Sequence, residues 1–342
     1  MPRRLVVDLA ATRPIWRAPE SFVVALRSAA PADWEVVPVA AAVSSDGDGS
    51  GGSTEAVAVA GGAEVYIGYG LPPAILDAAR GTLRWAHSAA AGVSASLGAL
   101  VGASGVVFTN SAGVHAEPMA EWAVGAVLHF FRGIDRVVRA QAEGRWAKDA
   151  LTALPTPLRE VAGSTAVVFG LGGIGTAVAR RLVALGARVR GVRRRPELGA
   201  PAGVELFGPD RCADALAGAD ILVVAAPLTD GTRGALGTAE LTGLAMGAVV
   251  VLLSRGKVLE EAVLLAALAS GRVGAAALDV YAEEPLPAGH SFWTHPRVLV
   301  CPHVSAVSPR FWEREQELVL DNWTRYRAGR ELRNRVDLVA GY

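Results

Sequence analysis

The stretch VVFGLGGIGTAVARRLVALG, residues 167–186, decides the fold class. A short apolar run is followed at once by glycines in the spacing G-x-G-x-x-G and then by a helix-like pattern. In such a turn the first glycine permits a tight bend, the second lets a pyrophosphate approach the backbone, and the third allows close helix–strand packing. The first amides of the following helix favour the anion. We therefore expect a dinucleotide to bind at Gly170, Gly172, Gly173, Ile174 and Gly175.

Apolar strand-like runs alternate with helical patterns through the rest of the chain, which predicts parallel sheets covered on both faces. The runs RLVVDLA, WEVVPVA and AEVYIGYG begin this alternation, and one amphipathic helix is expected over 117–144. A long helical pattern at 309–329 returns to the first part of the chain. We predict an α/β protein with a discontinuous domain, 1–115 and 306–342, around a dinucleotide-binding Rossmann domain, 116–305.

The composition excludes several classes of protein. The chain has 342 residues, 51% of them hydrophobic, and 33 basic residues balance 33 acidic ones, so neither nucleic acid nor anionic lipid is an expected partner. Two isolated cysteines, Cys212 and Cys301, predict neither a disulfide framework nor a metal site. No apolar run is long enough to span a bilayer and no signal peptide is evident, so we expect a cytoplasmic protein. The Gly/Ser/Asp-rich segment 44–54 is interpreted as a loop without an assigned function.

The arginine run that follows the second strand of the dinucleotide motif bears on the choice of cofactor. In GVRRRPE, residues 191–197, Arg193 stands where such sites commonly carry an acidic residue, which bonds the adenosine ribose. A guanidinium instead matches the oxygens of a 2′-phosphate. We interpret Arg193, Arg194 and Arg195 as selecting NADPH over NADH, with NADH as an alternative cofactor. The other interpretation is a solvated turn in an arginine-rich chain.

Several ordered segments resemble the signature blocks of one enzyme family. These segments are LRWAHSAAAGV (83–93), VVFTNSAGVHAEPMAEW (106–122), APLTDGTRGALG (226–237), LLSRGKVLEEAVL (252–264), AALDVYAEEPLP (276–287) and CPHVSAVSP (301–309). They are similar to the D-isomer-specific 2-hydroxyacid dehydrogenases, which include glyoxylate/hydroxypyruvate reductases. The resemblance implies a formate/glycerate dehydrogenase-like fold, in which two Rossmann-like domains enclose an active-site cleft.

The resemblance also implies a catalytic set. Arg255 would hold the carboxylate and carbonyl oxygen of a 2-oxo acid, because a fixed cation suits an anionic substrate on whose oxygen charge builds. His303 would be the general acid, and Glu284 would orient its imidazole and favour the charged form. Glu283 is the alternative to Glu284, which matches the family position directly before Pro285.

Further positions follow from the same resemblance. Asp279 and Thr229 would contact the cofactor, although a cap or a turn is the alternative for each. Backbone amides in the SAAAGV turn could hold the substrate carboxylate, with a plain tight turn as the alternative. The expected cofactor-binding residues also include Pro227, Thr232 and Ser254, and the expected substrate-binding residues are Ala91, Gly92, Val93, Tyr69, His115 and Trp312. Tyr69 and Trp312 have core or dimer surface as their alternative.

The chain departs from the family pattern beside His303. Cys301 stands where relatives usually have threonine, and Ser305-Ala306 replaces a common Gly-Gly. No catalytic group is lost, so we expect a homodimeric, NADPH-preferring reductase of small 2-oxo acids to D-2-hydroxy acids. The alternatives are NAD-linked oxidation of D-2-hydroxy acids and a nucleotide-sensing, corepressor-like binding protein.

Overall fold

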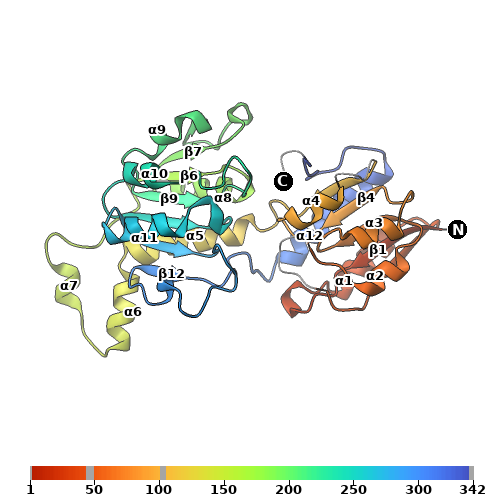
Figure 1. Cartoon of the computed structure of the whole chain (residues 1–342), viewed down its shortest axis with the longest axis horizontal. Helices are drawn as coiled ribbons and strands as arrows, with labels where there is room; N and C mark the ends of the chain where they lie inside the picture. Colours follow the sequence, from red (N-terminus) through yellow and green to blue (C-terminus); the bar gives the residue numbers. More distant parts are fainter. Residues whose placement is uncertain (1, 44–49, 101–104, 339–342) are drawn as a thin grey trace. The chain divides into compact units, whose positions relative to one another are not determined.

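The computed structural model describes residues 2–43, 50–100 and 105–338, so residues 44–49 of the Gly/Ser/Asp-rich segment lie outside the described part. The chain divides into two compact units. The terminal unit comprises the chain up to His115 and from Val307 onward, and the central unit is Ala116–Ala306. Each unit contains one parallel sheet (Figure 1).

The sheet of the terminal unit has the strand order β2-β1-β3-β4-β5. Its strands are β1 (Arg3–Asp8), β2 (Trp34–Pro38), β3 (Ala63–Gly68), β4 (Trp85–Ser88) and β5 (Val107–Asn110). The helices of this unit are α1 (Glu20–Ala29), α2 (Thr54–Val59), α3 (Pro73–Ala78), α4 (Ser94–Leu100) and α12 (Phe311–Arg327). Leu5 and Val7 pack with α1 and α12, whereas Val6 packs with α2 and α3. The sheet therefore lies between two layers of helices.

The sheet of the central unit has the strand order β12-β11-β10-β9-β6-β7-β8. Its strands are β6 (Thr165–Phe169), β7 (Arg188–Val192), β8 (Val204–Phe207), β9 (Ile221–Val224), β10 (Ala248–Leu252), β11 (Val273–Leu278) and β12 (Val298–Val300). The helices are α5 (Ala116–Phe131), α6 (Ile134–Ala142), α7 (Lys148–Thr152), α8 (Gly173–Ala184), α9 (Cys212–Leu216), α10 (Thr238–Gly243) and α11 (Glu261–Ala269).

The central strands are buried on both faces, as their continuous apolar sequences predict. Val167 and Phe169 of β6 pack with α10 and α11, whereas Ala166 and Val168 pack with α5 and α8. The strand order reverses between β6 and β9, and ligands of open α/β sheets bind outside the carboxyl ends of the strands at such a point.

The helix that the sequence predicts over 117–144 is two helices in the structure. The pattern at 117–144 is broken between α5 and α6 at Gly133, whose φ of 66° is left-handed. A side chain there would also meet Leu158 Cδ2 at 2.6 Å. The prediction of a single helix was wrong because both segments are amphipathic and one glycine is a weak signal in a helical pattern. Figure 1 shows α6 and α7 extending away from the sheet of the central unit.

None of the described helices combines the length and the apolar character that a bilayer crossing requires.

Candidate active site

The functional side chains of the central unit follow neighbouring strands. Ser254 and Arg255 come after β10, Asp279 and Glu284 after β11, and His303 after β12. These three strands are parallel and adjacent, so their carboxyl ends meet at one edge of the sheet. The topology therefore brings together residues that lie nearly fifty positions apart in the sequence.

The three glycines of the turn after β6 meet different surroundings. Gly170 has a φ of 103°, and a Cβ there would lie 2.5 Å from Ala226 Cα. A Cβ on Gly175 would lie 1.9 Å from the Gly170 carbonyl oxygen, so this position enforces close helix–strand packing. A Cβ on Gly172 would meet nothing within 4 Å. Gly172 is the residue before α8, and the space next to it is open to a ligand.

The arginine run adjoins this turn. The Gly170 N–H donates to the carbonyl of Val192, the last residue of β7, at 2.9 Å. Arg193 follows directly, and its Nη1 donates to the Gly199 carbonyl at 2.6 Å. Arg194 and Arg195 are exposed. Three consecutive arginines therefore follow the strand that ends beside the glycine turn.

The turn after β9 is braced by its own threonines. Thr232 Oγ1 donates to the Pro227 carbonyl at 2.6 Å and accepts from the Thr229 N–H at 2.8 Å. The two threonine hydroxyls lie 3.1 Å apart. These contacts account for both threonines as turn residues, and their contact with a cofactor stays a prediction.

Arg255 and Ser254 stand at the end of β10. Arg255 Nη1 donates to the Ser254 carbonyl at 2.7 Å. This bond holds the guanidinium near the end of β10. The Ser254 hydroxyl is buried and has no hydrogen-bond partner among the described residues. A buried hydroxyl without a partner is costly, so a ligand that bonds it would gain stability.

His303 and Glu284 form a hydrogen-bonded pair. Nδ1 of His303 lies 2.7 Å from Oε2 of Glu284, and Oε1 of Glu284 accepts from the Tyr281 N–H at 2.9 Å. Partial burial by itself would raise the pKa of Glu284, but the bonds from His303 and Tyr281 and the charges of His303 and Arg255 hold that pKa below its usual range. An ionised carboxylate only accepts, so Nδ1 carries the proton in this bond. This leaves Nε2 as the atom that can exchange a proton.

Asp279 is fully buried at the end of β11. Its carboxylate accepts the backbone N–H of Val304 at 2.9 Å and bonds both the N–H and the hydroxyl of Ser305. The carboxylate thus caps the loop that carries His303. A contact of Asp279 with a nicotinamide stays a prediction.

Two residues that the sequence analysis did not identify support the segments that carry Glu284 and His303. The buried Tyr281 hydroxyl accepts from the Cys301 N–H at 3.0 Å and lies 2.8 Å from the Leu278 carbonyl, so it ties the ends of β11 and β12 together. Glu261 of α11 accepts from the Ala282 N–H at 2.9 Å. The sequence could have indicated these two residues only by their positions. Tyr281 lies between Asp279 and Glu284, and Glu261 lies in the first turn of a helix.

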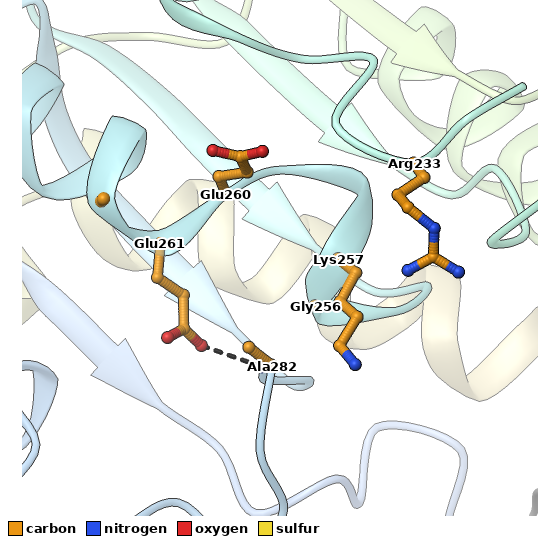
Figure 2. A pocket seen from close by; sticks show the side chains of 7 residues that line it. Arg233, Gly256, Lys257, Glu260, Glu261 and Ala282 are labelled. Carbon is orange, nitrogen blue, oxygen red and sulfur yellow. Dashed lines mark hydrogen bonds between the residues drawn. The ribbon is translucent and has the colours of Figure 1, made fainter. Parts of the chain in front are cut away.

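Figure 2 shows the Glu261 carboxylate turned toward Ala282, at an open hollow beside this loop. The hollow is lined by Arg233, Gly256, Lys257, Glu260, Glu261, Ala262 and Ala282. The second oxygen of Glu261 lies 3.3 Å from Nε2 of His290. Glu261 therefore links α11, the loop before Glu284 and the loop that leads to β12.

In the terminal unit, the turn after β4 has the features expected of an anion cradle. The amides of Ala91, Gly92 and Val93 have no acceptor among the residues that the structure describes. Asn110 Nδ2 donates to the Ala91 carbonyl at 2.8 Å, which fixes the orientation of this turn. Successive backbone N–H groups in a turn can bind a carboxylate.

The remaining predicted substrate residues lie in an aromatic cluster of the terminal unit. Tyr69 is 3% exposed and its hydroxyl donates to the Trp16 carbonyl, which places it in the core. The His115 ring stacks on Phe311 with centroids 5.2 Å apart, and the Trp312 indole donates to the Ile15 carbonyl at 3.2 Å. Substrate contact by Tyr69, His115 or Trp312 stays a prediction.

Known proteins share the sequence features of the two units described above. Residues 124–305 match the family model described as D-isomer specific 2-hydroxyacid dehydrogenase, NAD binding domain. The chain is 34% identical over 279 residues to glyoxylate/hydroxypyruvate reductase A of Yersinia enterocolitica, covering 79% of this chain and 85% of that protein.

Solved structures agree over nearly the whole chain. A D-isomer specific 2-hydroxyacid dehydrogenase from Xanthobacter autotrophicus, in complex with NADPH and MES, is 31% identical with a TM-score of 0.79, covering 100% of both chains. An NADPH-dependent glyoxylate/hydroxypyruvate reductase from Sinorhizobium meliloti, in complex with NADP and sulfate, is 27% identical with a TM-score of 0.78, covering 99% of this chain and 100% of that chain.

Proposed function

Since the chain belongs to the D-isomer specific 2-hydroxyacid dehydrogenase family, we propose that it reduces small 2-oxo acids to D-2-hydroxy acids with NADPH in preference to NADH. Membership makes it an NAD(P)-dependent oxidoreductase. The observation that carries the choice of reaction is the meeting of Arg255, Glu284 and His303 at one edge of the central sheet. A fixed cation beside a carboxylate–imidazole pair suits proton donation to an anionic substrate.

The residues of the central unit suit a dinucleotide. The space at Gly172 is open, the first amides of α8 lie next to it, and the Ser254 hydroxyl lacks a partner among the described residues. When bound, the nicotinamide supplies the hydride to C2 of the oxo acid. Arg193 would bond a 2′-phosphate, which favours NADPH. The two solved relatives described above were crystallised with NADPH or NADP, which supports this choice.

The protein groups then divide the work of the reduction. Arg255 forks to the carboxylate and the carbonyl oxygen and stabilises the negative charge that builds on the latter. His303 gives the proton of Nε2 to that oxygen, while Glu284 holds Nδ1 and stabilises the charged imidazole. In the terminal unit, the amides of Ala91 to Val93 would bind a carboxylate.

A second copy of the chain completes the proposed assembly. Trp146 and Leu154, on the segment that includes α7, are both 90% exposed, and Val137 and Val138 of α6 are about half exposed. Apolar side chains so exposed on one segment mark an interaction site. We place the contact of a homodimer there. We also place the enzyme in the cytoplasm, which suits its two free cysteines.

The test is a set of initial rates with NADPH and NADH against glyoxylate, hydroxypyruvate, pyruvate and branched 2-oxo acids. We expect His303→Gln to lower kcat by about 10²–10⁴-fold, the usual contribution of a general acid. His295→Gln is the matched control, because His295 lies in the loop before β12 and bonds the Arg297 N–H. An unaltered kcat in His303→Gln would refute the proposed role of His303. Binding of NADPH without turnover of any acid would favour a nucleotide-sensing binding protein.

A further inference from the structure

Ser305 makes a buried contact with Asp279 through its side chain. It is 4% exposed, and its hydroxyl donates to Asp279 Oδ2, which is fully buried. The Ser305 N–H lies 3.1 Å from Oδ1 and 3.3 Å from Oδ2 of the same carboxylate, and the Val304 N–H lies 2.9 Å from Oδ1. Ser305 thus gives Asp279 Oδ2 two donors, of which the hydroxyl is the closer, and the Cys301 thiol also bonds this carboxylate. A buried carboxylate oxygen that loses its short donor is left undersatisfied.

His303, which lies two residues before Ser305, has an unfavourable backbone conformation. His303 has a φ of 53°, and Asn334 is the only other non-glycine residue with positive φ in the described part of the chain. The left-handed region is disfavoured for residues with a Cβ, so the surroundings must hold it. The His303 N–H donates to the Cys301 carbonyl at 3.0 Å on one side, and Asp279 holds Val304 and Ser305 on the other.

We propose that Ser305 is a positioning residue, whose bond to Asp279 fixes the left-handed backbone of His303 and thereby the hydrogen bond between His303 and Glu284. A glycine at position 305 would offer only its N–H to the carboxylate. Serine adds the hydroxyl, which gives Oδ2 a second and closer donor than the long bond from the N–H. The inference rests on the proposed function, in which the pair of His303 and Glu284 delivers the proton.

The experiment compares Ser305→Ala, Ser305→Thr and the wild type in the reduction of glyoxylate and hydroxypyruvate. Alanine removes the donor, and threonine keeps a hydroxyl. We expect Ser305→Ala to lower kcat by about tenfold, because a small misplacement of a catalytic group is costly. The Kd of NADPH should stay within about twofold, and Ser305→Thr should keep most of the kcat. Ser270→Ala is the control, since that hydroxyl bonds the Ala267 carbonyl at the end of α11.

The pH profile separates positioning from a loss of folded protein. Glu284 is faced by His303 from the loop after β12, by Arg255 from the end of β10 and by the Tyr281 N–H from its own loop. Moving His303 away removes a bond that lowers the pKa of Glu284. The acid limb of kcat in Ser305→Ala should therefore shift to higher pH. A merely less stable protein would lose amplitude and keep the limb in place.

Wild-type kcat and an unmoved acid limb in Ser305→Ala would overturn the inference and leave the proposed function standing. A wild type that reduces no 2-oxo acid would instead refute the proposed function. In that case crystal structures decide the inference. A left-handed His303 with Nδ1 still near 2.7 Å from Glu284 in Ser305→Ala contradicts it, and an altered loop supports it. Ser305→Gly serves the same comparison if the alanine variant does not fold.

Discussion

Alanine at Gly172 and at Gly175 should separate cofactor binding from packing within the same turn. A Cβ at Gly175 would lie 1.9 Å from the Gly170 carbonyl oxygen, about 1.5 Å short of ordinary van der Waals contact. The obstacle is backbone, so we take the upper end of the usual overpacking cost, about 3 kcal/mol. For a unit of this size that corresponds to a fall in Tm of about 6–12 °C. Gly172→Ala meets nothing within 4 Å, and the weaker helix cap costs about 1 kcal/mol at most.

Cofactor affinity should respond in the opposite order. The Cβ at position 172 would occupy the space through which a pyrophosphate approaches, so we expect Gly172→Ala to raise the Kd of NADPH at least about tenfold, or 1.4 kcal/mol. Thermal unfolding without cofactor and titration by NADPH fluorescence measure the two effects. An equal fall in Tm for both variants would refute the steric reasoning. Wild-type affinity in Gly172→Ala would show that no phosphate lies over this glycine.

Three further predictions concern the cofactor, the pH dependence and the assembly. Arg193→Asp should lower the ratio of kcat/KM for NADPH to kcat/KM for NADH about thirtyfold, which corresponds to the loss of a hydrogen bond to a charged group. Equal use of both cofactors by the wild type would instead make the arginine run a solvated turn. The pKa of Glu284 is lowered in the folded protein, so its contribution to stability is present above the ordinary value near 4.5 and is lost as pH falls through the folded pKa. The free energy of unfolding, measured against pH, should fall over this range in the wild type and fall less in Glu284→Gln. Identical pH profiles of the two proteins would contradict the prediction. Serine at both Trp146 and Leu154 should convert a dimer to a monomer in light scattering, whereas a monomeric wild type would rule out the assembly.

The parts of the site that follow from local sequence could be predicted. The glycine turn is one, because each of its steric requirements acts within a few residues of the chain or on the adjacent strand. Arg255, Glu284 and His303 were identified through their resemblance to the family, and the sheet order shows why segments so distant meet. The break at Gly133 was missed, because a local pattern does not reveal that Leu158 packs where a side chain would point.

Contacts between strand ends could not be predicted. Tyr281 bonds the Cys301 backbone twenty residues away, and the Ser305 hydroxyl bonds a buried carboxylate that follows another strand. Tyr69 shows the same limit: its hydroxyl bonds the Trp16 carbonyl, a contact that the local sequence does not reveal, and its contact with a substrate stays a prediction. Whether a polar side chain faces a ligand or its own protein depends on burial, which the sequence around it does not encode.

The discontinuity of the terminal unit has a consequence for synthesis on the ribosome. Trp323 of α12 is fully buried and packs edge-on against Trp34 of β2 with ring centroids 4.6 Å apart, so the core of this unit is incomplete until α12 is made. The central unit lies between, and at ordinary elongation rates the first 115 residues wait about 10–40 s for that helix. During this interval the central unit can complete its own core, while the part of the terminal core that α12 covers remains exposed. The nascent chain should therefore expose its chaperone-binding segments before residue 115, and the last helix sets the pace of its folding.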